Sequence, residues 1–478
     1  MNDPNGLVYY QGEYHLFYQY HPGSPVFGVV HWGHAVSRDL VNWQHLPIAL
    51  YPDENGAIFS GSAVVDWDNT AGFGREAIVA IFTHDLQGYQ TQSLAYSTDR
   101  GRTWTKHSSN PVLSPPEGLR DFRDPKVFWH GETGAGHWVM VLAAGDAVRF
   151  YVSPDLRHWQ PGGCFGSAHG SHVGVWETPD LFKLPIREGP ETRWVLTVGV
   201  GDGGPAGKSG MQYFIGEFDG EKFRSENPET TILWADYGAD YYAAQSWSDE
   251  PAGRRVMIGW LTNWQYAAKV PTTTWRGVLS LPRELSLRQT RNGVRLGQQP
   301  VPELSALRGA HHHWQNVSIA PGTNLLTGIE GDCIEIVAEF QINSTIDIFG
   351  FEVRVGDCER TIIGYNAVLR ELFLDRSKSG ESSFDEDFAG IHCAEMEPEA
   401  GTIRLRIFVD RASIEVFGND GLVVLSDSVF PDEHSRRLGL FTEGSALDLK
   451  ALDVYELLPA AFTVFSGDRA SRPASHRN

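Results

Sequence analysis

Acidic side chains recur at the start of one class of short, apolar sequence segments. The segments are NDPNGLVYY, FSGSAVVDW, FRDPKVFWH, WETPDLFKL and DYYAAQSWS, and the polar residues near their starts are Asp3, Ser60 with Ser62, Asp124, Glu177 and Asp240. Carboxylates that converge raise one another's pKa and cost stability, so function explains them better than structure does. Oxygen-only clusters suit Ca²⁺ or Mg²⁺. A carboxylate nucleophile beside a protonated carboxylic acid suits glycosidic bond cleavage, and the surrounding aromatic residues favour this second chemistry.

A repeat in the first part of the chain supplies the elements that would position these groups. A turn of the form S-x-D followed by Trp occurs three times, with Ser37, Ser97 and Ser153 as its serines. Two further strand classes, one of which carries the carboxylates, each occur five times. About four strands per repeat and five repeats predict a five-bladed β-propeller. The first strand of each blade lines the central channel, so the carboxylates are expected to meet at its mouth.

The pattern changes after residue 285. The stretch RQTRNGVRLGQQPVPELSALRG is polar and contains Pro and Gly, whereas strands such as GTIRLRIFVDRASIEVFGN alternate between apolar and polar residues. Such alternation is typical of a sandwich with one solvated face on each sheet. We therefore expect an all-β protein with a propeller over 1–285, a linker over 286–310, a β-sandwich over 311–460 and a disordered tail over 461–478.

Composition narrows the classes of partner. The net charge of −21 argues against nucleic acid and anionic membrane, because both need a basic surface. No apolar run is long enough to span a membrane. The four cysteines form neither a CxxC pair nor a zinc-ligand spacing with His. The aromatic fraction of 12%, with 15 Trp, fits β-rich cores and also fits stacking on sugar rings.

In this order, the motifs NDPNG, FYQYHP, HWGHAVSRDLVNW, FSGSA, FRDPKV, WETPDLF, DYYAAQSW and PTTTWRGVLSLPREL resemble glycoside hydrolase family 32. That family includes invertases, exo-inulinases and levanases. The resemblance extends from residue 1 to about residue 457, since LDRSKSGESSF and RIFVDRASIEVFGNDG are similar to the family's C-terminal sandwich. It implies a five-bladed propeller joined to a β-sandwich, and retaining hydrolysis of terminal β-D-fructofuranosides without a metal or an organic cofactor.

The resemblance also assigns roles to residues. It implies that Asp3 is the nucleophile, that Glu177 is the general acid/base, and that Asp124 binds the fructose hydroxyls and stabilises the transition state. A retaining pair is expected about 5–5.5 Å apart, and Arg123 is expected to keep Asp124 ionised while Glu177 stays protonated. The implied substrate-binding residues are Asn2, Gln19, Phe27, Phe59, Ser60, Arg123, Asp240 and Trp264.

Four features depart from the family pattern. Thr178 stands where a Cys usually follows the acid/base Glu, and Phe27 stands where Trp is usual. Gln245 stands where invertases often carry Lys, which makes DYYAAQSW closer to fructan-degrading members. The residues that normally precede NDPNG are absent, and we expect upstream residues to be missing from this chain. The protein is then expected to be secreted, and otherwise cytoplasmic.

The preferred hypothesis is an exo-acting hydrolase of levan or inulin that also cleaves sucrose. A fructosyltransferase that uses the same covalent intermediate stays open, because the sequence does not define the acceptor site. A non-catalytic fructan-binding protein is the third alternative, which the presence of all three acidic residues disfavours. Linkage preference between β-2,1 and β-2,6 also stays open. So does the role of the sandwich, which could bind fructan chains or form a homodimer.

Overall fold

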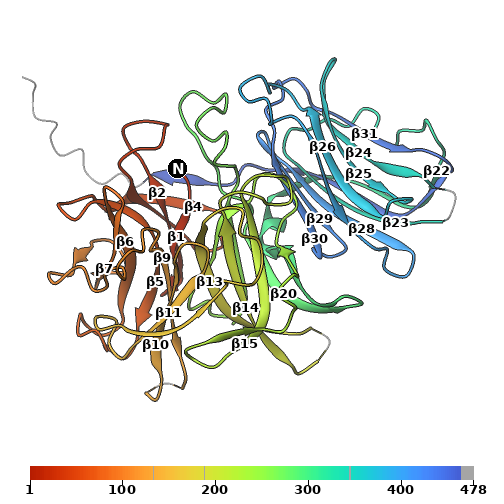
Figure 1. Ribbon diagram of the computed structural model, residues 1–478. Helices are drawn as coiled ribbons and strands as arrows, with labels where there is room; N and C mark the ends of the chain where they lie inside the picture. The colour runs from red at the N-terminus through yellow and green to blue at the C-terminus, as the bar shows by residue number, and fades with distance from the viewer. Residues whose placement is uncertain (133, 188, 344–345, 465–478) are drawn as a thin grey trace, which may run out of the picture.

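The structure is a computed structural model that describes residues 1–132, 134–187, 189–343 and 346–464. The described residues form β-strands and one 3₁₀ helix, η1 (Pro302–Leu307). No helix in this described part has the length and apolar character needed to cross a membrane. In Figure 1 the strands form two bodies, one running from red to green and the other from cyan to blue.

Five antiparallel sheets, here called blades, make up the first body. Blade 1 contains β1 (Pro4–Tyr10), β2 (Glu13–Tyr20), β3 (His31–Ser37) and β4 (Trp43–Leu50). Blade 2 contains β5 (Ala57–Asp66), β6 (Ala77–Leu86), β7 (Tyr89–Ser97) and β8 (Thr105–Lys106). Blade 3 contains β9 (Arg123–His130), β10 (His137–Ala143), β11 (Val148–Ser153) and β12 (Gln160–Phe165). Blade 4 contains β13 (Trp176–Pro185), β14 (Thr192–Val200), β15 (Gly210–Phe218), β16 (Phe223–Ser225) and β17 (Leu233–Trp234). Blade 5 contains β18 (Tyr242–Ser246), β19 (Arg255–Trp260), β20 (Arg283–Thr290) and β21 (Gly293–Pro300).

The innermost strands close the blades into a ring. β1 contacts β5, β5 contacts β9, β9 contacts β13, β13 contacts β18, and β18 contacts β1. Apolar side chains fill the space between neighbouring blades, as where Val79 and Ile81 of β6 share a buried cluster with Met140 and Leu142 of β10. The predicted five-bladed propeller is therefore confirmed.

The repeated S-x-D turn has one structural role in all three copies. In blade 1, the Asp39 carboxylate accepts hydrogen bonds from the backbone N–H groups of Val41 and Asn42, and Ser37 Oγ donates to the same carboxylate. The Trp43 indole N–H donates to the carbonyl of Leu40. Equivalent bonds occur in the copies that begin at residues 97 and 153. The motif thus satisfies the backbone of the turn before each outermost strand.

Two segments differ from the sequence prediction. The stretch 286–310, expected to be a linker, contains most of β20, all of β21 and η1, so blade 5 extends past residue 285. These outer strands expose one face, which explains their polar sequence, and a tight hairpin joins Thr290 to Gly293. The predicted tail begins with β33 (Phe462–Val464), which pairs in parallel with β4. Residues 465–478 of that tail lie outside the described residues.

The second body is a β-sandwich of two antiparallel sheets. One sheet has the order β22 (Arg308–Ile319), β32 (Leu447–Leu457), β23 (Ile334–Gln341), β28 (Thr402–Val409), β29 (Ser413–Gly418) and β30 (Val423–Ser428). The other has the order β27 (Ile391–Glu395), β26 (Glu371–Lys378), β25 (Arg360–Asn366), β24 (Ile348–Val355) and β31 (Arg437–Thr442). Their inner faces enclose one large aliphatic and aromatic core.

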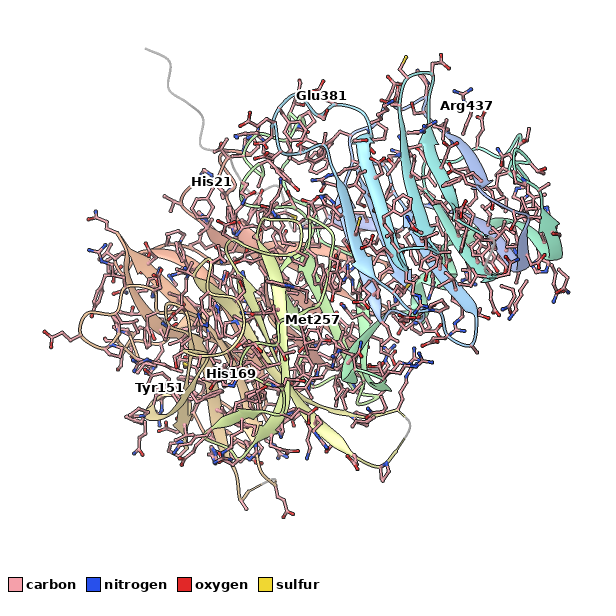
Figure 2. All side chains as sticks on the ribbon, turned by 45° about the vertical axis from the view of Figure 1, so that its right-hand side comes forward. His21, Tyr151, His169, Met257, Glu381 and Arg437 are labelled. Carbon is pink, nitrogen blue, oxygen red and sulfur yellow. The ribbon has the colours of Figure 1, made fainter. Side chains whose placement is uncertain are left out.

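The interface between the two bodies contains buried charges. Arg283 of β20 is fully buried, donates to Asp236 at 3.0 Å, and reaches across to Glu415 of β29 at 2.7 Å. Removing one partner of a buried ion pair strongly destabilises the folded state, because the other charge is left buried without compensation. Figure 2 shows Met257 in the propeller beside this interface, and Glu381 and Arg437 on the sandwich. The interface therefore fixes how the sandwich sits against blade 5.

Candidate active site

Each innermost strand is interrupted by a β-bulge near its start. The bulges lie at residues 6–7, 59–60, 124–125, 178–179 and 243–244. Four bulges contain a residue with positive φ, namely Gly6 at 55°, Asp124 at 64°, Thr178 at 48° and Ala243 at 52°. Such a conformation is unfavourable for a β-branched residue such as Thr178. Bulges redirect side chains, so these five places aim residues that a regular strand would point elsewhere.

Asp3 immediately precedes β1, and both of its carboxylate oxygens accept hydrogen bonds. Ser60 Oγ donates to Oδ2 at 2.6 Å, and Asn2 Nδ2 donates to Oδ1 at 3.0 Å. The backbone is also fixed, because Gln19 N–H donates to the Asp3 carbonyl at 3.0 Å. Burial raises the pKa of Asp3 above its ordinary value; the bonds from Ser60 and Asn2 oppose this, and Glu177 adds to it. Asp3 is thus a half-buried carboxyl held in one orientation.

Glu177 accepts hydrogen bonds from two different blades. Arg123 of β9 donates to Oε1 through Nη2 at 3.0 Å and through Nε at 3.2 Å. The Tyr242 hydroxyl of β18 donates to Oε2 at 2.6 Å. Arg123 is itself oriented by Asp121 at 2.6 Å and by Gln90 at 3.3 Å. Burial raises the pKa of Tyr242 well above its ordinary value, and Glu177 adds to the effect, so Tyr242 is a permanent donor.

Asp124 is almost completely buried, with 6% of its surface exposed. Its Oδ2 accepts the backbone N–H of Thr178 at 2.9 Å, and its own N–H donates to Thr83 Oγ1 at 3.1 Å. Burial raises the pKa of Asp124 to about 7, Arg123 opposes the rise, and the other two carboxylates increase it. Arg123 thus acts in the expected direction on Asp124, but it does not hold the pKa of Asp124 at its ordinary value, and its ion pairs are formed with Glu177 and Asp121.

Most of the other predicted substrate-binding residues lie around these carboxylates. Ser60, Asn2 and Arg123 contact them directly. Gln19 is buried beside Asn2 and donates through Nε2 to the carbonyl of Ile58. Phe27 and Trp264 are exposed aromatic residues whose rings meet edge to face at 5.6 Å. They are available to contact a ligand from the solvent side.

Phe59 is partly buried and occupies the blade 2 bulge next to Ser60. Its carbonyl accepts the indole N–H of Trp32 at 3.0 Å. This bond ties the bulge of blade 2 to β3 of blade 1. Phe59 therefore helps to fix the backbone from which the Ser60 hydroxyl reaches Asp3.

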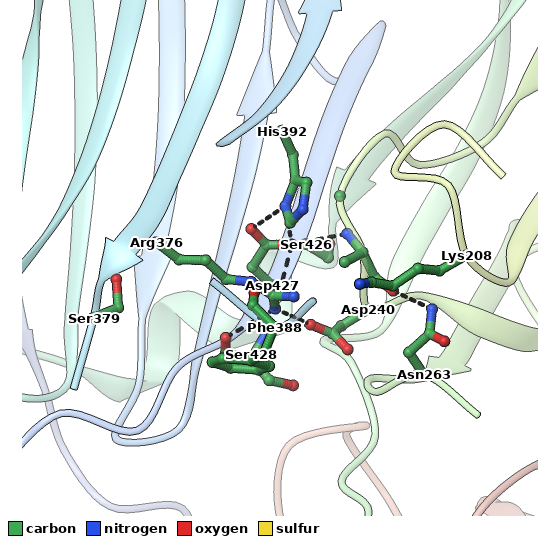
Figure 3. A network of polar contacts seen from close by, with 12 residues as sticks. Lys208, Asp240, Asn263, Arg376, Ser379, Phe388, His392, Ser426, Asp427 and Ser428 are labelled. Atoms are coloured by element: carbon green, nitrogen blue, oxygen red, sulfur yellow. Dashed lines mark hydrogen bonds and ion pairs between the residues drawn. The ribbon is translucent and has the colours of Figure 1, made fainter. Parts of the chain in front are cut away.

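Asp240 does not join the carboxylate cluster. It is fully buried between blade 5 and the sandwich, where Oδ2 accepts Arg376 Nη1 at 2.6 Å and the Ser428 N–H at 2.8 Å (Figure 3). Its Oδ1 accepts the Tyr266 hydroxyl at 2.5 Å. The equivalence with the other carboxylates fails because β18 begins only at Tyr242. Asp240 thus contributes to the domain interface.

Tyr242 is the site residue that the sequence prediction missed. It lies in the quoted motif DYYAAQSW, where its neighbour Tyr241 packs under Arg283 at 3.8 Å. A bulge just after Tyr242 decides which tyrosine faces Glu177. Room for the ring comes from Gly199 of β14, since a Cβ there would lie 3.0 Å from Tyr242 Cε2 and 3.1 Å from Thr178 Oγ1. The motif was visible in the sequence, but the direction in which each of its side chains points could not be predicted from it.

The arrangement favours acid–base and nucleophilic chemistry over cation binding. The oxygens of Asp3 and Glu177 already accept bonds from N–H and O–H donors, which a bound cation would have to displace. Burial and neighbouring carboxylates raise the pKa of Asp3 and of Asp124, so the groups of the cluster need not share one protonation state at neutral pH. One group can therefore act as a nucleophile while another transfers a proton.

Comparisons with known proteins identify the family of this chain. The family models "Glycosyl hydrolases family 32 N-terminal domain" and "Glycosyl hydrolases family 32 C terminal" match residues 1–300 and 303–456. A levanase of Bacillus subtilis is 53% identical over 96% of this chain and 68% of its own length. A levanase of Bacillus sp. strain L7 is 42% identical over 95% of this chain, which spans 50% of that protein. The crystal structure of an exo-inulinase from Aspergillus awamori superimposes with a TM-score of 0.89 at 36% identity, covering 96% of each chain. Because the two family models together match nearly the whole sequence, this chain belongs to glycosyl hydrolase family 32.

Proposed function

We propose that the protein releases terminal β-D-fructofuranosyl residues from fructans and sucrose with retention of configuration. Asp3 is the nucleophile, Glu177 is the general acid/base, and Asp124 binds the sugar hydroxyls. The observation that carries the proposal is the clustering of these three carboxyl groups on three different blades, where each is held by donors from a neighbouring segment. Such a cluster does not stabilise the fold, so catalysis explains its presence better than structure does.

In the first step, Asp3 attacks the anomeric carbon while Glu177 protonates the oxygen of the leaving sugar. The bonds from Ser60 and Asn2 hold the Asp3 carboxylate in one orientation, which reduces the entropy that the attack must lose. Because the pKa of Asp3 is raised, activity falls as the pH drops through that pKa and the nucleophile takes up a proton.

In the second step, Glu177 removes a proton from water, which attacks the fructosyl–Asp3 ester and releases fructose. Arg123 and Tyr242 hold the Glu177 carboxyl group in one orientation for this step, because both donate to its oxygens. Asp124 is rigidly placed by the Thr178 N–H and can accept hydrogen bonds from sugar hydroxyls. Bonds of this kind contribute to rate when they strengthen in the transition state.

The names of the relatives support a fructan as substrate and exo action as the mode. Two relatives are levanases, and the superimposed structure is an exo-inulinase. The exposed rings of Phe27 and Trp264 are placed to stack on a sugar next to the one being cleaved. A homodimer through the sandwich domain remains a proposal, which light scattering coupled to size-exclusion chromatography would test.

The test is chromatographic product analysis after separate incubation with sucrose, inulin and levan. We expect free fructose as the only early product from the polymers, and no product with the Glu177→Gln variant. Ser305→Ala is the control: it removes an exposed hydroxyl on η1, outside the carboxylate site, and should retain activity. Short oligofructosides would indicate endo action, and elongated ones a fructosyltransferase. Absence of product from all three substrates would overturn the proposed function.

A further inference from the structure

Three ligand-type side chains converge on the outer face of the sandwich, away from the carboxylate site. His311 Nε2 and His313 Nδ1 both lie 2.7 Å from the same oxygen, Oδ1 of Asp453. One coordinating atom from each residue lies within 4.8 Å of the others. The side chains are 43%, 47% and 23% exposed, so an ion can reach them from solvent.

Strand geometry explains the convergence. His311 and His313 are two residues apart on β22, and side chains with this spacing share one face of a strand. Asp453 is the direct cross-strand partner of His313 on β32, and His311 is the partner of Tyr455. His312 points to the opposite face, where its ring stacks near Trp314. The face that carries the three groups is thus fixed by the pairing of β22 with β32.

The His311 ring is held in place before any ion binds. It stacks on Tyr455 with ring centroids 4.3 Å apart and planes 10° from parallel. Arg308, the nearby cation, stacks on the same tyrosine and is engaged by both oxygens of Glu335. An oriented imidazole loses less conformational freedom on coordination, so this packing favours a ligand role over a loosely held surface histidine.

The donor set indicates the type of ion. Imidazole nitrogen suits Zn²⁺ and its neighbours in the first transition series, whereas Ca²⁺ and Mg²⁺ prefer oxygen ligands alone. Two histidines and one carboxylate leave a fourth tetrahedral position for water. With bonds of about 2.0–2.2 Å to Zn²⁺, neighbouring ligand atoms would lie roughly 3.3 Å apart. The present 2.7 Å contacts need to open by only about half an ångström.

We propose that His311, His313 and Asp453 form a surface Zn²⁺ site that fastens β22 to β32. β22 is the edge strand of its sheet, and most of its residues are exposed. It also follows directly after η1, which connects the sandwich to blade 5. An ion shared between the two strands would therefore stabilise the segment where the sandwich begins. The site lies in a different domain from the carboxylates and has no part in sugar cleavage.

Isothermal titration of the untagged, chelator-treated full chain with ZnSO₄ tests this site. We expect one Zn²⁺ per chain, at least tenfold weaker binding in His313→Gln and in Asp453→Asn, and unchanged binding in His312→Gln. Thermal unfolding should show that Zn²⁺ raises the Tm of the parent chain and of His312→Gln, because an ion that binds only the folded state stabilises it. The same ion should leave the Tm of His313→Gln unchanged.

The histidine variants alter exposed side chains and Asp453→Asn alters a partly exposed one with little change in shape, so all are expected to fold, and circular dichroism checks this directly. Equal Zn²⁺ binding by the parent chain and by His313→Gln would overturn the proposal, because the ion would then be held elsewhere. Absence of any binding by the parent chain would overturn it as well, and would leave the three residues as a hydrogen-bonded cluster. Sucrose hydrolysis by all variants should match the parent, which separates this site from the proposed function.

Discussion

Replacing Asp124 by Asn should stabilise the protein at alkaline pH. The folded state raises the pKa of Asp124 from 3.8 to about 7. Between these values the folded chain holds a proton that the unfolded chain has released, so stability falls as the pH rises through this window. At about 1.4 kcal/mol for each pKa unit, the cost of ionised Asp124 above pH 7 is ~4 kcal/mol. Asn carries no charge, and its amide oxygen can still accept the Thr178 N–H.

The assay is thermal unfolding of the parent chain and of Asp124→Asn at pH 4 and at pH 8. An unfolding entropy of about 2 cal/mol/K per residue gives roughly 1 kcal/mol/K for a chain of this length, so the variant should melt about 4 °C higher at pH 8. At pH 4 the difference should nearly vanish. Asp68→Asn, at an exposed carboxylate, is the control and should shift neither curve. An equal Tm difference at both pH values would refute the reasoning, and activity on sucrose should be lost in Asp124→Asn alone.

Three further substitutions test the surroundings of the site. Tyr242→Phe removes the hydroxyl that donates to Glu177 at 2.6 Å. It should lower kcat by about one to two orders of magnitude, shift the pH–rate profile and leave KM similar. An unchanged pH–rate profile would contradict the role of the hydroxyl. Gly199→Ala places a methyl group 3.0 Å from the Tyr242 ring and should lower kcat while circular dichroism stays unchanged. Arg376→Met leaves Asp240 buried without its ion pair and should lower the free energy of unfolding by denaturant by about 3–5 kcal/mol. Adding Asp240→Asn to the same chain should restore much of this stability. If Arg376→Met alone is as stable as the parent, the ion pair does not hold the interface.

The sequence predicts the inner and middle strands of the blades better than the outer strands. Inner and middle strands are buried on both faces, so their apolar runs recur visibly along the chain, and five copies could be counted. The outer strands of blade 5 are half exposed and resemble a polar connection. Their hairpin was still detectable, because Asn292–Gly293 in the segment TRNGV is a turn signal between two such strands.

For the site, residue types were predictable, but their directions were not. Asp3, Asp124 and Glu177 could be identified from motifs in the order of the blades. Pairing of Arg123 with Glu177 and the role of Tyr242 depend on bulges, where a shift of one position reverses the face on which a side chain lies. Asp240 was misplaced because the start of β18 was expected too early; the strand begins at Tyr242, so Asp240 precedes it and lies in the domain interface.

The bulges also bear on how such a molecule can change over time. Hydrophobic contacts between blades involve the regular parts of the strands together with Leu7, Ala243 and Ala244 of two bulges, whereas the residues of the other three bulges belong to none of the buried hydrophobic clusters. One blade presents Ser60 at its bulge, another Asp124 and another Thr178, without altering the apolar framework. The functional residue at the bulge of one blade can therefore be substituted without changing those of the other blades. A duplicated structural unit can in this way acquire different chemistry in each copy and keep a common architecture.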